Sequence, residues 1–301
     1  MIFNQNPNIA KIVLLLFITV LSLGAEASEP EVFYYAGNNR PALETEAIKK
    51  VEVSRVSDKK IWMETYIKSN GNWKIVQREK IQVKTSDQHT ISHYDGSLLT
   101  YKTKRSFTRN EHNGYLFEDR RDGILIRSGH AKNKIPLHLQ GAITEFYENG
   151  SKRSVSLFND NQLVWNHNWL RNGDKYLDTI FYSVDSWPEY LNGSAVLKTH
   201  LNNHIVNSKY YNGGLEGTIL LGFVIMENGD LDGVHMVNGS FMDIGKVAVE
   251  GFQSLPGKWK PATLNNQTVR CFMTFPINFI HRVGMFDEVI ISGNVLFYNY
   301  R

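Results

Sequence analysis

The chain has 301 residues, of which 42% are hydrophobic and 21% charged, and its formal net charge is +3. This composition is that of a globular protein, and the length suggests roughly one to three domains. The small net charge gives no reason to expect binding to nucleic acid or to an anionic membrane, and the aromatic content of 12% argues against general disorder. The one short basic run, residues 102–105, is interpreted as an exposed strand face.

The N-terminus has the pattern of a targeting segment. Lys11 precedes an apolar run over residues 12–25, and Ala25-Glu26-Ala27 offers a small-x-small cleavage site before Ser28. The run is shorter than the about 20 residues that a membrane-spanning helix needs. Residues 1–27 are therefore predicted to be a signal peptide that is cleaved on export. The alternative is that residues 12–25 are retained as a membrane anchor.

Turn signals recur along the next part of the chain. They are Asn-Gly or Asp-Gly pairs, which supply the positive φ angles of tight hairpin turns. Short β-branched and aromatic segments lie between them, so the pattern predicts a run of β-hairpins forming a meandering sheet or a short solenoid over residues 28–210. The pairs are Asn70-Gly71, Asp95-Gly96, Asp122-Gly123, Asn149-Gly150, Asn172-Gly173 and Asn192-Gly193.

Within this region, residues 141–182 contain two similar units. "EFYENGSKRS" and "NWLRNGDKYL" align on their Asn-Gly pairs. The segment resembles the MORN-type repeat variant of bacterial toxin–antitoxin-like and surface proteins. That resemblance implies a β-hairpin scaffold for contacts, without shared catalysis. The alternative is two unrelated hairpins.

Residues 211–281 have a different pattern. Two strands surround Asn228-Gly229 in residues 217–239, and the first has alternating apolar residues. Ser240 and Asp243 resemble a capping box, and the apolar spacing from Ile244 to Leu255 is that of an amphipathic helix. Pro256-Gly257 ends this helix.

The run "GKWKPA" then returns the chain to the sheet, and Trp259 is predicted to fill the gap between helix and sheet. In the last strand one face is apolar and the other carries Arg270, Phe272 and Thr274. Pro276 has no backbone N–H to donate, so we expect an edge or a bulge there. Cys271, the only cysteine, lies in this strand and is interpreted as a small buried residue, so no internal disulfide forms.

Residues 214–280 resemble the C-terminal domain of the TonB family. The resemblance is carried by "GTILLGFVIMENG", "MDIGKVAVEGFQSLP", "VRCFMTFPINF" and the motif Trp259-Lys260-Pro261-Ala262. It implies a periplasmic domain of one helix on an antiparallel sheet, which binds a segment of an outer-membrane transporter by adding a strand to its sheet edge. On this basis Arg270, Phe272 and Thr274 are the predicted partner-binding residues.

The chain also departs from that family. It lacks the long Pro-rich spacer of a force-transmitting member and carries the hairpin region in its place, which puts energy transduction in doubt. A C-terminal extension over residues 282–301 is predicted to form a further hairpin around Gly293-Asn294, which could cover the binding edge. A homodimer formed by strand exchange is left open.

Candidates for catalysis or metal binding are few. His200 and His204 are four residues apart, a spacing that suits a metal on a helix, but no Glu stands beside them, and no metal site is expected. Four carboxylates near predicted turns could furnish a pair for glycoside chemistry, although solvated side chains are the simpler interpretation. They are Asp119, Asp122, Glu145 and Glu148. The other histidines considered, at 93, 112, 130, 138 and 167, follow no ligand spacing.

The sequence thus predicts an α+β fold: a hairpin-repeat region followed by a small TonB-like domain with one helix. The predicted function is that of an exported, non-enzymatic periplasmic protein without a cofactor, which binds a protein partner by strand addition. One alternative is an energy transducer with a retained anchor. A second is a hydrolase or small-ligand binder that uses the hairpin region, and converging, partly buried carboxylates or histidines in a pocket would favour it.

Overall fold

The computed structural model describes residues 29–111, 114–211, 215–239, 242–280 and 288–290. The predicted signal peptide or anchor, the Ser240 cap and the hairpin around Gly293-Asn294 lie outside the described residues. No helix among the described residues is both long and apolar enough to cross a bilayer.

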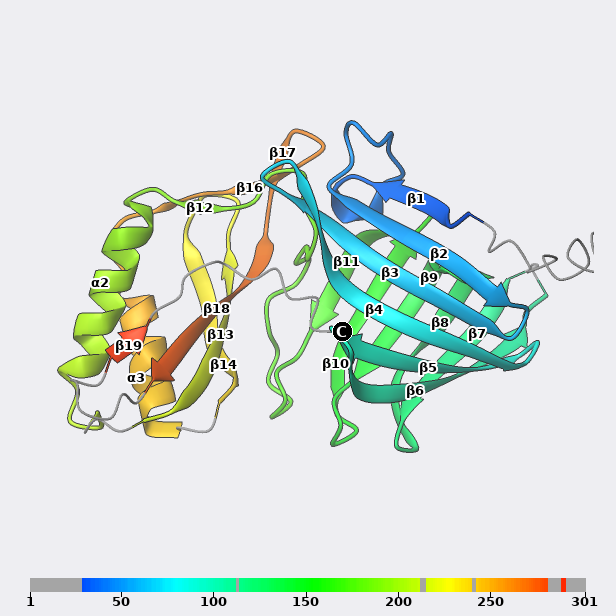
Figure 1. Cartoon of the computed structure of the whole chain (residues 1–301). Helices are drawn as coiled ribbons and strands as arrows, with labels where there is room; N and C mark the ends of the chain where they lie inside the picture. The colour runs from blue at the N-terminus through cyan, green and yellow to red at the C-terminus, as the bar shows by residue number, and fades with distance from the viewer. Residues whose placement is uncertain (1–28, 112–113, 212–214, 240–241, 281–287, 291–301) are drawn as a thin grey trace, which may run out of the picture.

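One antiparallel sheet dominates the molecule. Its 11 strands follow one another in chain order, each paired with the next. In Figure 1, β2–β6 pass in front of β7–β11, so the sheet curls into two facing layers. The strands are β1 (Glu31–Tyr35), β2 (Lys49–Ser57), β3 (Lys60–Ser69), β4 (Asn72–Thr85), β5 (Gln88–Asp95), β6 (Leu98–Arg109), β7 (Tyr115–Arg121), β8 (Ile124–Lys134), β9 (Leu137–Phe146), β10 (Lys152–Asn159) and β11 (Gln162–Asn168).

The α+β class predicted from the sequence is therefore wrong. The described chain is mostly antiparallel β, and the hairpins join into one continuous sheet. The short helix η1 (Gly37–Asn39) brings the two ends of this sheet together. The side chain of Asn38 donates to the backbone oxygen of Leu163 at 2.8 Å and accepts from its N–H at 2.9 Å.

The Asn-Gly and Asp-Gly signals correspond to real turns with one exception. The first four pairs connect β3 to β4, β5 to β6, β7 to β8 and β9 to β10. Asn172-Gly173 forms a turn just after β11. Asn192-Gly193 was predicted to be a hairpin turn, and this is wrong, because helix α2 (Gly193–Val206) begins there.

Three Asn-Gly turns share one hydrogen-bond pattern. In each, the Asn side-chain oxygen accepts the N–H two residues later, at 3.0 Å for Asn149, 3.1 Å for Asn172 and 3.0 Å for Asn228. The first two turns are the centres of the aligned units in residues 141–182, and the third lies in the C-terminal part. Because the same geometry occurs outside these units, it does not by itself identify a repeat.

The inner face of the large sheet is apolar toward one end. Cross-strand neighbours there include Ile61, Ile81 and Ile91, each 1–2% exposed. A second apolar cluster continues around the curve of the sheet. Its buried members are Phe107, Phe117, Ala131, Leu139, Ile143, Phe158 and Leu163.

Acid is expected to destabilise the protein through His89, which lies in this apolar half. The ring is 5% exposed and packs on Phe107, with centroids 5.1 Å apart. Burial, followed by the charges of Arg105 and Lys134, lowers the pKa of His89 to about 4. The unfolded chain therefore binds a proton at His89 more tightly than the folded chain does. The contribution of neutral His89 to the free energy of unfolding is complete above the unfolded pKa of about 6.5 and is lost as the pH falls toward 4.

We expect the free energy of unfolding to drop by about 1–2 kcal/mol between pH 7.5 and 5 on account of His89 alone. Urea denaturation at the two pH values measures this drop. His89→Gln should show a drop smaller by that amount. An equal drop in the wild type and the variant would show that His89 does not cause the acid sensitivity.

A second, smaller sheet forms the C-terminal unit. Its strand order is β14 (Leu231–Asn238), β13 (Gly217–Ile225), β18 (Cys271–Ile280) and β19 (Glu288–Ile290). Short strands complete the unit: β12 (Glu189–Tyr190) pairs with β15 (Trp259–Lys260), and β16 (Ala262–Leu264) pairs with β17 (Gln267–Val269).

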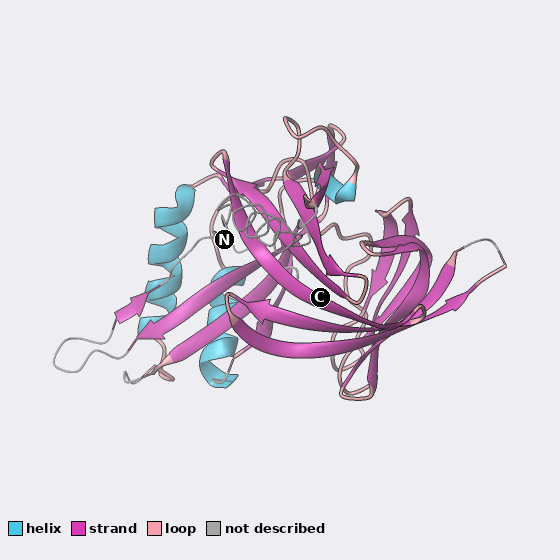
Figure 2. Cartoon of the chain, turned by 45° about the vertical axis from the view of Figure 1, so that its right-hand side comes forward, coloured by secondary structure: helices cyan, strands magenta, loops and turns pink. Residues whose placement is uncertain are grey.

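Two helices, not one, pack on this sheet. α3 (Met242–Gln253) buries Ile244, Val247, Ala248, Gly251 and Phe252, as the sequence predicts. α2 packs beside α3 and buries Leu197, Leu201 and Ile205 in the same core. The prediction of a domain with one helix is therefore wrong. Figures 1 and 2 show both helices on the side of the small sheet that faces away from the large sheet.

The segment between the two sheets, residues 175–187, is bonded to both. At β11, the backbone N–H of Tyr176 donates to the backbone oxygen of Asn168, and that of Thr179 donates to the backbone oxygen of Asn166, both at 2.8 Å. Phe181 then pairs with β18, donating to the Arg270 oxygen at 2.9 Å and accepting from the Phe272 N–H at 3.0 Å. The connection is thus an irregular segment that backbone hydrogen bonds hold to β11 at one end and to β18 at the other.

Candidate functional site

The predicted partner-binding residues lie against the chain's own connecting segment. Arg270 donates to the carboxylate of Glu227 and, at 3.0 Å, to the backbone oxygen of Asp178. Phe272 packs on Tyr182, with ring centroids 5.6 Å apart. Thr274 is 1% exposed. Arg270 lies just before β18, on the same face as Phe272 and Thr274, and the connecting segment covers this face.

β18 is an interior strand of the small sheet, with β13 along one edge. Along its other edge it pairs with Phe181 at Cys271 and with β19 from Asn278 to Ile280. Pro276 lies between these two contacts, where no described strand continues the ladder. The expected edge at Pro276 is therefore local to a strand that is otherwise flanked on both sides.

The outer edge of β14 is more open. Among the described residues, β14 pairs only with β13, and no other strand hydrogen-bonds to its outer side. The one contact to this edge from the connecting segment is Tyr176, whose hydroxyl donates to the Gly233 oxygen at 2.7 Å. Asp232 and Asn238, near its two ends, are exposed. Sequence patterns gave no means of choosing between edges, because strand order is a tertiary property.

The Trp-Lys-Pro-Ala motif, residues 259–262, contributes to the core of the C-terminal unit. Trp259 is 4% exposed and contacts the rings of Phe223 and Tyr190, at centroid distances of 5.7 and 5.1 Å. Ala262 is fully buried, whereas Lys260 points into solvent. The motif thus closes the core of the C-terminal unit, which agrees with the predicted role of Trp259.

Cys271 is fully buried, and burial strongly raises the pKa of its thiol. Only the thiolate is reactive. We expect no reaction with a thiol-specific reagent in the native protein at pH 8, and complete reaction after denaturation in guanidinium. Rapid labelling of the native protein would contradict this placement.

Charged side chains gather on the inner face of the large sheet, beyond its apolar half. They form one cross-strand row, here named the charged row, in which each residue faces the next on the neighbouring strand. Opposite charges alternate along its first four positions. Its members are Arg105, Asp119, Arg127, Glu145, Ser154 and Asn168.

The centre of the charged row is Asp119, which is held by two guanidinium groups. Arg105 binds both carboxylate oxygens at 2.6 and 2.9 Å, and Arg127 binds one of them at 2.8 and 3.1 Å. The Asp119 side chain is 3% exposed. Burial alone would raise the pKa of this carboxyl, but the two arginines outweigh it and lower the pKa to about 2.

This arrangement does not suit the carboxylate pair that was considered for glycoside hydrolysis. A glycosidase needs one carboxylic acid with a raised pKa, and Asp119 stays ionised at neutral pH. Glu145 is a neighbour of Arg127 in the charged row and accepts a hydrogen bond from Ser154 at 3.3 Å. Asp122 and Glu148 lie at exposed turns, with Glu148 3.7 Å from Arg121. The four carboxylates do not converge on one cavity.

Near the charged row, Glu79, His93 and Thr103 lie in a line. His93 Nδ1 is 3.0 Å from the Glu79 carboxylate, and Nε2 is 3.0 Å from the Thr103 hydroxyl. A hydroxyl, an imidazole and a carboxylate in this order can activate a nucleophile. Thr103 is only 4% exposed, however, and lines neither of the two cavities described below. We interpret the three as an interior polar cluster: His93 is hydrogen-bonded to Thr103, whereas its Nδ1 lies near Glu79 without hydrogen-bond geometry.

The basic run at residues 102–105 and the histidine pair at 200 and 204 can also be placed in the structure. In residues 102–105, Lys102 and Lys104 are exposed, whereas Thr103 and Arg105 face inward, so only half of the run is a solvent face. Within the described residues no three His, Cys, Asp or Glu side chains lie together as a metal group would require. His200 instead contacts the Gly251 oxygen at 3.1 Å and the Ser254 hydroxyl at 3.0 Å.

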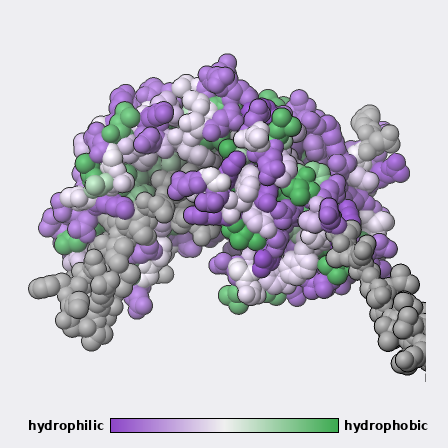
Figure 3. Space-filling model, turned by 45° about the horizontal axis from the view of Figure 1, so that its top comes forward, coloured by the Kyte–Doolittle hydropathy of each residue, from purple (hydrophilic) through white to green (hydrophobic). Residues whose placement is uncertain are grey.

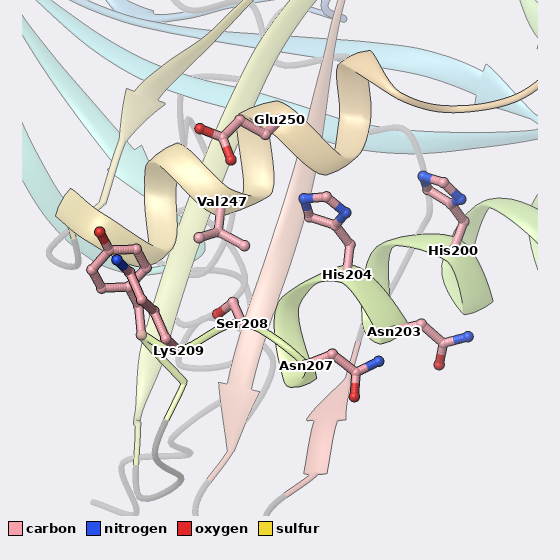
Figure 4. A pocket seen from close by; sticks show the side chains of 9 residues that line it. His200, Asn203, His204, Asn207, Ser208, Lys209, Val247 and Glu250 are labelled. Atoms are coloured by element: carbon pink, nitrogen blue, oxygen red, sulfur yellow. The ribbon is translucent and has the colours of Figure 1, made fainter.

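Two surface cavities remain as binding candidates. The first, of about 580 Å³, lies between the C-terminal half of α2, the loop 207–210 and α3, and is here named the helix cleft (Figure 4). The second, of about 310 Å³, lies between the large sheet and the β16–β17 hairpin and is lined by Leu163, Phe181, Asn265 and neighbouring residues. On the face in Figure 3, apolar side chains otherwise form separate small patches among hydrophilic ones.

No protein-family model, curated protein or solved structure matches the chain. The resemblances to the TonB and MORN families therefore remain interpretations of the sequence.

Proposed function

We propose that this is an exported binding protein whose C-terminal unit takes up an extended segment of a polypeptide partner as an added strand. The proposed location is the periplasm, and an outer-membrane transporter or a periplasmic assembly is the proposed partner class. Export and location rest on the pattern of residues 1–27 and on the TonB resemblance of residues 214–280.

The observation that supports strand addition is the outer edge of β14. An edge strand presents unpaired backbone donors and acceptors, and an extended peptide can satisfy them without any change in the sheet. The described part of the small sheet is covered elsewhere: α2 and α3 pack on one face, and Tyr176 and Tyr182 contact residues of the other. We therefore assign the contact to β14, and not to the β18 face that carries Arg270, Phe272 and Thr274.

The edge of β14 is also irregular, which bears on selectivity. The pairing of β13 with β14 shifts register twice, between Leu220 and Leu221 and between Gly222 and Val224. Bulged edges resist indiscriminate strand pairing. A partner strand must match these bulges, so backbone pairing here is selective for shape as well as for side chains.

Site-specific crosslinking tests the proposal on the full mature chain. Asp232→Cys and Asn238→Cys place a thiol at either end of β14, and the buried native Cys271 should not react with a maleimide photo-crosslinker. Lys102→Cys, on the exposed outer face of β6, is the matched control. With detergent-solubilised envelope we expect a covalent adduct with one polypeptide from the two β14 sites and none from position 102.

Adducts of equal yield from all three positions, or from position 102 alone, would contradict strand addition at β14. Absence of any adduct from the β14 positions would contradict it as well.

A further inference from the structure

Basic side chains gather on the outer face of the large sheet, in two neighbouring cross-strand rows. Ile61, Ile81 and Thr103 are buried on the inner face, so the residues that alternate with them lie on the outer face, which β3–β6 turn toward the viewer in Figure 1. The five basic members of the two rows are here named the basic face. The first row is Trp62, Lys80, Ser92 and Lys102, and the second is Lys60, Gln82, Thr90, Lys104 and Arg120.

The two rows contain no acidic side chain, and the four lysines of the basic face form no ion pair with any described residue. Lysines on other parts of the described surface are often paired. The ion-paired ones include Lys132, Lys134, Lys175, Lys246 and Lys258.

The carboxylates that border the basic face are already committed. Glu64 is 2.6 Å from Arg78 in the row on one side. Glu118 is 2.9 Å from Arg120 on the other side. The turn beside Lys60 carries Asp58 and Lys59, one charge of each sign. Four positive charges, those of the lysines, are therefore unbalanced.

This concentration of charge contributes nothing favourable to the fold. Lys104 is directly opposite Arg120 across the β6–β7 pair, and like charges in that position destabilise a sheet. Lys80 and Lys102 flank Ser92 from the two neighbouring strands, which places their backbones roughly 10 Å apart. That is about the screening length at physiological ionic strength, so the lysines act together on an anionic partner.

The shape of the basic face favours an extended anionic surface over a nucleic-acid strand. None of its members lines either of the two cavities, whereas single strands lie in positively charged grooves with aromatic rings that stack on the bases. Trp62, the one aromatic residue in the two rows, is half-buried and already contacts Tyr94 at 5.5 Å and Lys80 at 6.0 Å. Clusters of about four to eight basic residues suit the headgroups of anionic lipids.

We propose that the basic face binds the surface of a bilayer that contains anionic phospholipids, with Lys60, Lys80, Lys102 and Lys104 beside the headgroup phosphates. The net charge of +3 does not reveal this face, because it is a sum over the whole chain. The contact does not rest on strand addition, since β14 is no part of it. Lipid at position 102 would also give no polypeptide adduct in the crosslinking experiment.

Sedimentation of the full mature chain with lipid vesicles tests the proposal. One kind of vesicle is phosphatidylcholine alone, and the other contains equal parts of phosphatidylcholine and phosphatidylglycerol. We expect binding to the anionic vesicles that weakens as sodium chloride is raised, and little binding to the neutral ones. The combined variant Lys80→Gln, Lys102→Gln and Lys104→Gln should bind about a hundredfold more weakly, because each basic residue near an anionic surface contributes about fivefold.

The matched control is the combined variant Lys209→Gln, Lys246→Gln and Lys260→Gln, which removes the same charge from exposed positions of the C-terminal unit. It should bind as the wild type does, and circular dichroism checks that both variants fold. The lipid and salt dependence of the wild type test the proposal without any variant.

Four results would overturn the proposal. They are no binding to the anionic vesicles, equal binding to the two kinds of vesicle, equal weakening by the two variants, and tighter binding of a single-stranded oligothymidylate than of the anionic vesicles. The last result would assign the basic face to nucleic acid.

Discussion

Replacing Asp119 by Asn is expected to lower the free energy of unfolding by about 3–5 kcal/mol, the usual cost of removing one partner from a buried ion pair. The change leaves the guanidinium groups of Arg105 and Arg127 on the inner face of the large sheet without their shared counter-charge. Their side chains are only 10% and 16% exposed, so water cannot fully replace the carboxylate. Urea or guanidinium denaturation followed by circular dichroism measures the loss.

The matched control is the neighbouring acidic residue, Glu118. It points to the outer face, is 48% exposed and pairs with Arg120. Exposed ion pairs contribute little, so Glu118→Gln should change the free energy of unfolding by less than about 1 kcal/mol. Similar effects of the two substitutions would show that the charged row is not buried as described.

Replacing Gly229 by Ala is expected to destabilise the protein by about 3–5 kcal/mol, through two effects. Gly229 has a φ of +80°, which is unfavourable for any residue with a Cβ. A Cβ there would also overlap the backbone oxygen of Trp259. The two residues are held close together because the backbone N–H of Trp259 donates to the Gly229 oxygen at 3.0 Å. Because the overlapped oxygen belongs to the backbone of Trp259, whose side chain is buried in the core, it cannot move aside at low cost.

Gly150→Ala separates the two effects. Gly150 occupies the same position in the turn between β9 and β10, with a φ of +82°, and its Cβ would meet no atom within 4 Å. We expect a loss of about 1–2 kcal/mol there, from backbone strain alone. Equal losses at Gly150 and Gly229, measured by chemical denaturation, would contradict the close approach of Trp259.

The comparison of sequence with structure separates local from long-range information. The turns at Asn70-Gly71 and the three pairs that follow were predictable, because their conformation depends on two adjacent residues. The inward side of α3 and of β18 was predictable for the same reason, since a helix or strand has a fixed period. The union of these hairpins into one sheet was not, because it depends on pairings that local patterns do not encode.

Helix α2 shows how a local signal can be outweighed. Leu197, Leu201 and Ile205 recur every four residues, a helical spacing, and all three are buried. Exposed apolar residues such as Val196 and Val206 obscure this stripe, and the Asn192-Gly193 pair has the pattern of a hairpin. Here tertiary packing on α3 decides the outcome over local propensity.

The candidate sites were the least predictable part. The charged row is made by the register of six strands, and that register changes at bulges such as the one between Asp119 and Arg120. The helix cleft joins α2 to α3, which lie about 40 residues apart in the chain.

Hydrogen exchange of β14 tests the central claim, strand addition, most directly. The mature chain is measured by mass spectrometry alone and in complex with the partner captured through position 232 or 238. The account predicts that amides within residues 231–238 exchange at least about tenfold more slowly in the complex, because an added strand protects the outer edge. Unchanged exchange in β14, with new protection confined to the large sheet, would contradict it and move the partner-binding surface to residues 31–168.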